Sequence, residues 1–347
     1  MSGIKSFLQA LHDCLAALIL LFLTASAVTA QVNTTDKDVP VQIRLTPDKN
    51  TIMLGEPLFF AVDVTNLSGE KFCLGVGGDY RNRFGRPESF SVSVKDGDGK
   101  TLPQFEVINM GGLSGCGVIE PGETYTFRLF LADWAKIERP GSYQIDVARN
   151  MAFSSWESGA RNPKYSIKAH LSAEFTVVPA DENKMGGVIN ALGSLMLDIG
   201  DPHAVESATA LASIQDKRTI SYFAEALRKF GGVEVNDPFA RQYTIVARSI
   251  VALGTYDDDR AIEALRDAMN SSWKDTRLNI ASVFRDSPHK SAIKLMLEMQ
   301  NDEYWFVRLR VAQGLKNIKT NEALAALQKL LKDEVEDVRN AAKESLN

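Results

Sequence analysis

The stretch Asp302-Glu-Tyr-Trp-Phe-Val-Arg308 returns 31 residues further along the chain as Asp333-Glu-Val-Glu-Asp-Val-Arg339. The same interval, counted backwards, gives a third compatible set, which is Arg277, Phe284, Ile293 and Met296. Between these positions the apolar residues follow helical spacing. A period of about 20 to 50 residues is typical of stacked supersecondary units. The C-terminal half is therefore predicted to be a stack of helical hairpins.

Two further units precede these repeats. They lie 42 residues apart and share an arginine among apolar residues, their members being Leu211, Arg218, Ile220 and Phe223 in one and Leu253, Arg260, Ile262 and Leu265 in the other. The longer interval falls at Gly231-Gly-Val-Glu-Val-Asn-Asp237-Pro238, which indicates a looped insertion. We expect about four helix pairs and a terminal capping helix over residues 180–347, with Lys343 and Glu344 on the outer face of the cap.

A family resemblance is carried by four short stretches, which are Asp201-Pro-His-Ala-Val-Glu-Ser-Ala208, Asp216-Lys-Arg-Thr-Ile220, Trp305-Phe-Val-Arg308 and Asp337-Val-Arg-Asn-Ala-Ala342. They resemble HEAT repeats, including the short bacterial kind first noted in phycobilin lyases, over about residues 200–347. The resemblance implies a right-handed α-solenoid, a fold that many unrelated binding proteins share. Because Arg277, Arg308 and Arg339 recur in register, we interpret them as a structural ladder rather than a binding site.

Residues 39–179 follow a different pattern, in which apolar and polar residues alternate. The alternation predicts strands at Val41–Leu45, Leu58–Thr65, Phe90–Val94, Tyr125–Leu131, Tyr143–Val147 and Ala173–Val177, with weaker candidates at Cys73–Val76 and Leu102–Ile108. Turn sequences such as Pro121-Gly-Glu123 separate these runs. Seven or eight short strands are the number that a β-sandwich needs, so this region is predicted to be one.

Pro140-Gly-Ser-Tyr143 resembles the corner tyrosine of bacterial immunoglobulin-like domains. The expected fold is multidomain, an all-β immunoglobulin-like sandwich followed by an all-α HEAT-type right-handed solenoid. The boundary is expected at Pro179-Ala-Asp181, where the period changes from two to that of a helix.

The first thirty residues indicate a signal peptide. An apolar run from Cys14 to Leu23, too short to span a membrane, is followed by small residues that suit cleavage after Ala30. Residues 31–38 then form a short N-terminal segment. Retention of residues 1–30 as an anchor is the alternative. We expect an exported protein, periplasmic or extracellular, and the family resemblance favours a bacterial envelope.

Cys73 and Cys116 remain after this cleavage, and an exported location permits them to form a disulfide. The alternative is two separate buried thiols. The chain carries a formal net charge of −5 and lacks a block of basic residues. This argues against nucleic acid and anionic membranes as partners, and no membrane insertion is expected once the signal is cleaved.

No catalytic, cofactor-binding or metal-binding residue is assigned. Deoxyhypusine hydroxylase, a HEAT-repeat enzyme, holds two irons through His-Glu dipeptides, whereas the three histidines after residue 30 precede Leu171, Ala204 and Lys290. Gly112-Leu-Ser-Gly-Cys116 lacks the spacing of a nucleophile elbow and is interpreted as a flexible glycine loop. Asp96-Gly-Asp-Gly-Lys100 lacks the glycine and glutamate of a calcium loop and is predicted to be a hairpin turn. We therefore expect a protein that is not an enzyme.

Three aromatic residues are candidates for partner binding. Trp305 and Phe306 occupy positions that are charged in both neighbouring repeats, whereas Tyr304 aligns with apolar residues and is expected in the core. Trp156 lies in a polar stretch between two predicted strands. The alternative for Trp305 and Phe306 is packing against the insertion or the sandwich, and for Trp156 a lid over the sandwich core.

The leading hypothesis is a non-catalytic protein–protein interaction scaffold with the solenoid as binding surface and an unidentified protein as partner. Polar residues of the second helices mix both signs, which favours a folded protein over a polyanion; they are Glu225, Arg228, Glu263, Arg266, Lys294 and Glu298. The alternatives are an enzyme or enzyme helper of lyase-like or hydrolase type, or a proteinase inhibitor acting through the sandwich.

Overall fold

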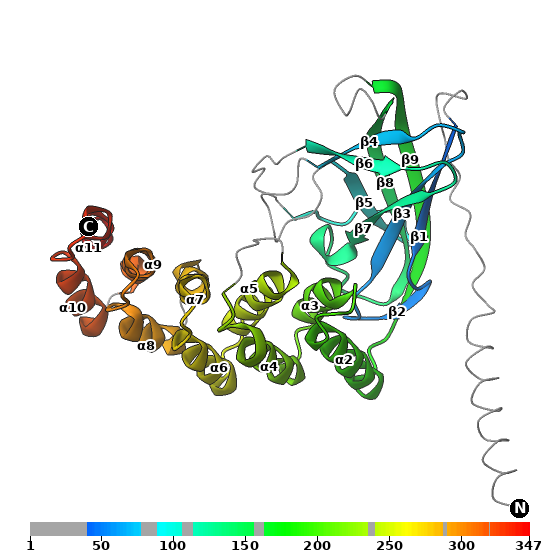
Figure 1. Cartoon of the computed structure of the whole chain (residues 1–347). Coiled ribbons are helices and arrows are strands. Elements are labelled where there is room, and N and C mark those ends of the chain that lie inside the picture. The colour runs from blue at the N-terminus through cyan, green and yellow to red at the C-terminus, as the bar shows by residue number, and fades with distance from the viewer. Residues whose placement is uncertain are drawn as a thin grey trace, which may run out of the picture. The chain divides into compact units, whose positions relative to one another are not determined.

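The computed structural model describes residues 40–77, 89–105, 114–155, 163–234, 240–286, 290–318 and 320–347. The chain divides into a β unit that ends at Pro179 and a helical unit that comprises Ala180–Asn347 together with Gly55–Pro57 (Figure 1). An all-β sandwich is thus followed by an all-α array, which confirms the predicted fold class. The predicted signal peptide, its cleavage site after Ala30 and the segment 31–38 lie outside the described residues.

The β unit consists of two sheets. Its strands are β1 (Val41–Pro47), β2 (Thr51–Met53), β3 (Phe59–Asn66), β4 (Phe72–Gly77), β5 (Ser91–Asp96), β6 (Ser114–Ile119), β7 (Thr124–Phe130), β8 (Gly141–Ser155) and β9 (Pro163–Val178). One sheet has the order β1-β3-β7, and the other has the order β2-β9-β8-β4-β6 with β5 paired to β8. Only the β2–β9 pair is parallel among these ladders.

The core of the β unit lies between the two sheets. The alternate residues that the sequence singled out point inward, such as Ile43 and Phe60 in one sheet and Ile145 and Phe175 in the other. The rings of Phe60 and Phe175 meet edge to face with centroids 5.8 Å apart. Burial of one face of each sheet against the other explains why both follow a period of two.

Tyr143 forms the tyrosine corner that its sequence context predicted. Its hydroxyl donates a hydrogen bond to the carbonyl of Arg139 at 2.7 Å. Its ring is 4% exposed and stacks on Phe175 with centroids 5.6 Å apart. The hydrogen bond fixes the chain where it enters β8.

We expect Tyr143→Phe to lower the free energy of unfolding by about 1 kcal/mol, because the Arg139 carbonyl loses a buried donor. Urea denaturation of the full chain, followed by fluorescence, measures this loss. Tyr222→Phe is the control, since its hydroxyl bonds Asn190 at the surface, and it is expected to change the same quantity by less than about 0.5 kcal/mol. Equal losses in both variants would contradict the corner assignment.

The glycine-rich stretch Gly112–Cys116 was not predicted correctly. Its described part begins strand β6, which pairs with β4 so that Cys116 faces Gly75, and it is therefore no flexible loop. Small residues carry no apolar alternation, so only the partner strand reveals this one. The strand expected at Leu102–Ile108 is likewise absent from its described part, residues 102–105, where one isolated bridge joins Gln104 to Ala135.

The turn Asp96–Lys100 closes a hairpin, as predicted. The Asp96 carboxylate accepts hydrogen bonds from the backbone N–H groups of Asp98 (3.1 Å) and Lys100 (3.0 Å). Arg139 Nη2 donates to the same carboxylate at 2.7 Å. Burial opposes ionisation of Asp96, but the hydrogen bonds from Lys100 and Arg139 hold its pKa below the ordinary value.

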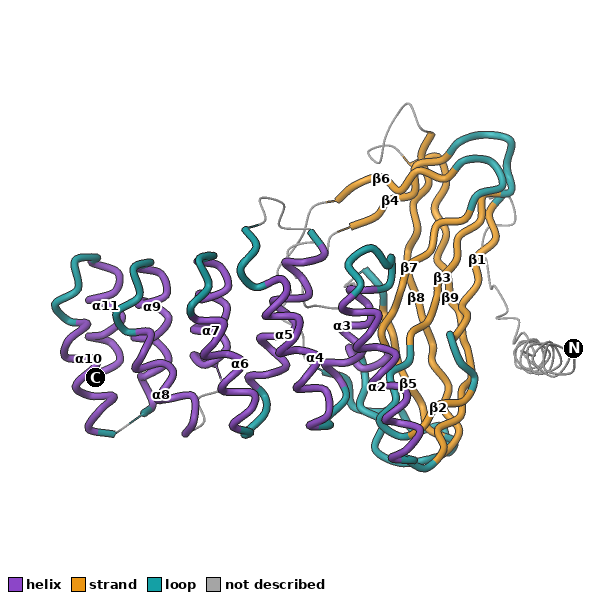
Figure 2. The backbone as a smooth tube through the Cα atoms, turned by 60° about the horizontal axis from the view of Figure 1, so that its bottom comes forward, coloured by secondary structure: helices purple, strands orange, loops and turns teal. Residues whose placement is uncertain are grey.

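The helical unit is built from two rows of helices. One row holds α3 (Ala204–Ser213), α5 (Arg241–Gly254), α7 (Lys274–Asp286), α9 (Trp305–Gly314) and α11 (Glu336–Leu346). The other holds α2 (Glu182–Leu197), α4 (Ile220–Phe230), α6 (Asp259–Met269), α8 (Lys290–Met299) and α10 (Asn321–Leu330) (Figures 1 and 2). Consecutive helices alternate between the rows, so each hairpin packs on the next. None of the described helices is both long and apolar enough to cross a bilayer.

The 31-residue repeat is visible in the helix starts. Helices α7, α9 and α11 begin at Lys274, Trp305 and Glu336, each 31 residues after the last. Helix α2 precedes the four expected pairs and was not anticipated. Asp181 caps it by accepting hydrogen bonds from the backbone N–H groups of Asn183 and Lys184.

Candidate protein-binding surface

The recurring arginines form a ladder of buried ion pairs between successive hairpins. Arg277 Nε donates to Asp302 Oδ2 at 2.8 Å, and Arg308 Nε donates to Asp333 Oδ2 at 2.7 Å. The Nη1 atoms of Arg277, Arg308 and Arg339 each donate to a carbonyl six residues earlier. The side chains of Arg308 and Asp333 are only 10% and 7% exposed. The guanidinium groups of Arg277 and Arg308 therefore join repeats, as the sequence predicted, whereas that of Arg339 binds the loop before its own helix.

The acidic half of the ladder also shapes the loop before each helix. Asp302 Oδ1 accepts the backbone N–H of Tyr304, and Asp333 Oδ1 accepts that of Val335. One repeat earlier, Ser271 Oγ accepts the N–H of Trp273 in the same way. The hydrogen bond from Arg308 outweighs the cost of burial and holds the pKa of Asp333 below its ordinary value. Each aspartate thus orders the loop before one hairpin while it holds the preceding hairpin.

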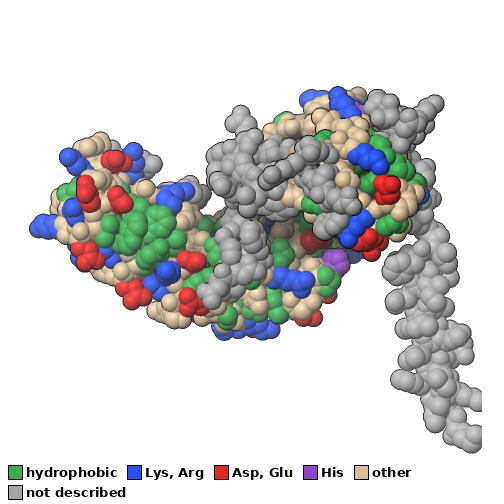
Figure 3. Space-filling view, turned by 45° about the horizontal axis from the view of Figure 1, so that its top comes forward, with side chains coloured by type: hydrophobic (Ala, Val, Ile, Leu, Met, Phe, Trp, Pro, Cys, Tyr) green, Lys and Arg blue, Asp and Glu red, His purple; other side chains and the backbone are tan. Residues whose placement is uncertain are grey.

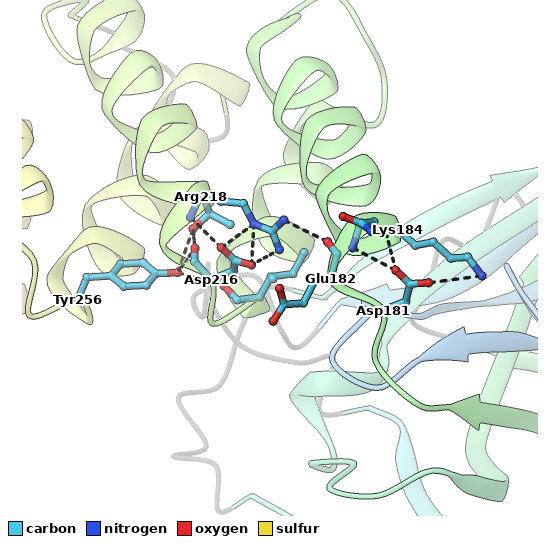
Figure 4. A network of polar contacts seen from close by, with 9 residues as sticks. Asp181, Glu182, Lys184, Asp216, Arg218 and Tyr256 are labelled. Carbon is cyan, nitrogen blue, oxygen red and sulfur yellow. Dashed lines mark hydrogen bonds and ion pairs between the residues drawn. The ribbon is translucent and has the colours of Figure 1, made fainter.

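The first hairpins are joined by a different polar network (Figure 4). Asp216 accepts the backbone N–H of Arg218 at 2.8 Å and binds its guanidinium, which reaches on to the carbonyl of Glu182 at 3.1 Å. The hydroxyl of Tyr256 donates to the carbonyls of Ile214 (3.0 Å) and Asp216 (3.1 Å). These contacts link α2, α4 and the loop before α6, so their polar groups serve the fold.

The same aspartate–arginine arrangement returns at Asp258 and Arg260. Arg260 Nε lies 3.0 Å from Asp258 Oδ1, and Lys217 Nζ of the preceding unit lies 3.1 Å from Asp258 Oδ2. The recurrence of this pair after 42 residues confirms the longer interval of the sequence repeat. Residues 235–238 of the predicted insertion lie outside the described chain.

An aromatic cluster, defined as Tyr304, Trp305 and Phe306, stands at the start of α9. The centroids of the Trp305 and Phe306 rings lie 5.1 Å apart, and Tyr304 contacts both rings edge-on at 6.4 and 6.3 Å. All three residues are half-buried, so each presents part of its ring to solvent. Figure 3 shows hydrophobic side chains gathered on the surface of this end of the helical unit.

Two cations lie over the rings of the aromatic cluster. Lys274 Nζ is 5.2 Å from the centre of Tyr304, and the Arg310 guanidinium carbon is 4.8 Å from the centre of Phe306. The sequence prediction missed both. The spacing of four residues from Phe306 to Arg310 and the alignment of Lys274 with Trp305 were the available signals.

The placement of Tyr304 corrects the sequence prediction. It was expected in the core, yet it is half-buried, whereas Trp273 at the same position of the previous repeat is 5% exposed and packs on Tyr243. The first turns of α7 and α11 carry acidic residues, but that of α9 carries none. Among these three equivalent helix starts, the one at α9 is thus aromatic where the others are charged.

The remaining candidate residues of the sequence analysis are Trp156, Cys73 and Cys116. Trp156 lies outside the described residues. Cys73 and Cys116 form a disulfide with Cα atoms 5.2 Å apart, which joins β4 to the edge strand β6. Over the described ranges, no group of three or more His, Cys, Asp or Glu residues is arranged to hold a metal ion.

Comparison with known proteins finds similarity of fold. No curated protein is similar enough to match the chain. The solved structure of human deoxyhypusine hydroxylase with glycerol is 18% identical over 46% of this chain and 72% of that one, with a TM-score of 0.28. An engineered protein is 20% identical over 46% and 78%, with a TM-score of 0.32. The CARDB domain of a Pyrococcus furiosus protein, in complex with di-metal ions, is 12% identical over 44% and 90%, with a TM-score of 0.19.

These similarities are too low to transfer an activity, and the family match is narrower than the helical unit. The family of HEAT repeats matches residues 270–347. The arginine ladder and the helix starts spaced by 31 residues occupy the same stretch. Residues 270–347 of this chain are HEAT repeats.

Proposed function

We propose that this protein is an exported, non-catalytic interaction scaffold that binds a protein partner through the aromatic cluster. HEAT repeats are typical of protein-binding scaffolds, which supports a binding role for residues 270–347. The single observation that carries the proposal is the group of three half-buried rings at a helix start whose equivalents are charged. The ladder beside it keeps that helix start in place.

The chemistry of the cluster favours one kind of partner segment. Trp and Tyr are enriched among residues that carry interface energy, because they bury much area at little entropic cost. Lys274 and Arg310 add positive charge beside the rings. A segment with an apolar side chain beside a carboxylate would contact the rings with the first and approach the two cations with the second.

The proposed export rests on the leader sequence and is supported by the disulfide. Disulfides persist in oxidising compartments and are rare in the cytosol, and Cys73 and Cys116 are placed to form one. A periplasmic or extracellular location accommodates both features.

We expect Trp305→Ala combined with Phe306→Ala to weaken binding of the partner about 30-fold, a loss of about 2 kcal/mol, since truncated hot-spot aromatics have effects of this size. The partner is first identified as the protein that the immobilised wild type retains from envelope extract and the double variant does not. Titration calorimetry with that protein, purified, then gives the two affinities.

Leu324→Ala combined with Leu331→Ala is the matched control. These leucines are 39% and 37% exposed on and after α10, so the control also removes two apolar side chains from the surface. It is expected to retain the partner, and circular dichroism checks that all forms are folded. If both variants retain the same proteins as the wild type, the aromatic cluster is not the binding site.

A further inference from the structure

A groove lies between α4 and α6, in the row that holds α2, α4, α6, α8 and α10. Its volume is about 400 Å³, and Ala224, Leu227 and Gly231 line it from the α4 side. Ala264 and Ala268 line it from α6. The three alanines and Gly231 allow the backbone of a bound segment to approach closely, as small residues do where helices pack against one another.

Some of the charged residues at the rim of this groove form ion pairs with described residues and others do not. Arg228 forms an ion pair with Glu225 of its own helix, and Arg260 is held by Asp258. Glu263 and Asp267 also line the groove, are exposed, and form no ion pair with any described residue. Because they lie four residues apart on α6, both carboxylates stand on the same wall, one helical turn apart. The groove therefore presents an uncompensated negative wall.

The next groove in the same row shows a different arrangement. Between α6 and α8, Arg266 Nε lies 3.1 Å from Glu298 Oε2 and bridges the two helices. Within the described chain, no ion pair bridges α4 and α6 in this way. The described residues of α4 and α6 are thus not bridged along the length of these helices, and the ion pair of Lys217 with Asp258 lies at their starts.

We propose that the α4–α6 groove binds an amphipathic helix of a protein partner, with small apolar residues on one face and two basic residues one turn apart beside them. The small face enters between Ala224, Ala264 and Ala268, and the two cations pair with Glu263 and Asp267. Helices commonly bind grooves through residues spaced by three or four positions. The proposal uses no residue of the aromatic cluster and stands independently of it.

The test uses a synthetic helical peptide with alanines on one face and two lysines four residues apart, and a second peptide with glutamates in place of the lysines. Fluorescence anisotropy with the full chain is expected to show binding of the lysine peptide only. Glu263→Gln combined with Asp267→Asn should weaken that binding about tenfold, or about 1.4 kcal/mol. Both positions are exposed, so the fold is expected to be unchanged.

The control variant, Glu322→Gln combined with Glu344→Gln, changes the net charge equally at exposed positions of α10 and α11. It is expected to bind the lysine peptide within twofold of the wild type. Ala264→Leu keeps every charge but fills part of the groove, and it should also weaken binding. Absence of lysine-peptide binding, equal binding of both peptides, or equal losses in the two charge variants would overturn the proposal. An unchanged affinity of Ala264→Leu would overturn it as well.

Discussion

Replacing Arg308 by methionine is expected to lower the free energy of unfolding of the helical unit by about 3–5 kcal/mol, the usual cost of removing one partner from a buried ion pair. Methionine keeps much of the side-chain volume but leaves the Asp333 carboxylate, 7% exposed, without its guanidinium. The carbonyl of Asp302 also loses a donor. Urea denaturation followed by circular dichroism at 222 nm reports on the helices.

Arg266→Met is the matched control, because Arg266 also joins two helices but its pair with Glu298 is about one third exposed on both sides. Its expected loss is about 0.5 kcal/mol. Losses of similar size in the two variants would show that burial does not determine how much these ion pairs add to the free energy of unfolding.

The Arg308–Asp333 pair also predicts a pH dependence. Because the pKa of Asp333 is lowered in the folded state, its stabilising contribution is complete above the unfolded value of about 3.9 and is lost as the pH falls through the folded value. The difference between the wild type and Arg308→Met should therefore shrink below about pH 4. A difference that is constant from neutral to acidic pH would contradict ionisation of Asp333 as its cause.

Removing the disulfide is expected to lower the free energy of unfolding of the β unit by about 2–4 kcal/mol. Cys73 and Cys116 are 43 residues apart, so the bond closes a long loop in the unfolded chain. It also holds β6, an edge strand with one ladder partner, to β4. The double variant Cys73→Ala and Cys116→Ala is compared with the oxidised wild type in urea, with tryptophan fluorescence as the signal.

The wild type in reducing buffer is the companion measurement. It should unfold close to the double variant, since both lack the cross-link but keep the other contacts of the β unit. If all three samples unfold at the same urea concentration, the cross-link does not contribute to the stability of the β unit.

The sequence predicted the parts of the fold that repeat or alternate. Arg277, Arg308 and Arg339 recur at one interval, and the structure confirms that the first two join their repeat to the next, whereas Arg339 binds the carbonyl of Asp333 before its own helix. Tyr143 could be identified because a corner tyrosine needs a turn before it and an alternating strand after it. The arginine pattern is visible because the same contact recurs along the chain. The tyrosine pattern is visible because its contact needs one fixed local geometry.

Other features depend on what lies opposite in space. Strand β6 is visible only through its pairing with β4, and its glycines gave no alternating signal. The half-buried state of Tyr304 contrasts with the buried Trp273 at the same repeat position, so alignment alone could not assign it. The α4–α6 groove follows from which ion pairs form between helices, and a list of charged residues does not decide that.

The ladder also bears on how successive hairpins are joined. Each of the two buried ion pairs connects one hairpin to the next. Among the described residues, neither pair reaches beyond the adjacent hairpin, so each of these two joints is held by its own pair. The hairpin that carries the aromatic cluster takes part in both pairs. Its Asp302 accepts a hydrogen bond from Arg277, and its Arg308 donates one to Asp333. A partner bound to those rings would therefore contact the hairpin that takes part in both buried ion pairs, and so both joints next to its contact.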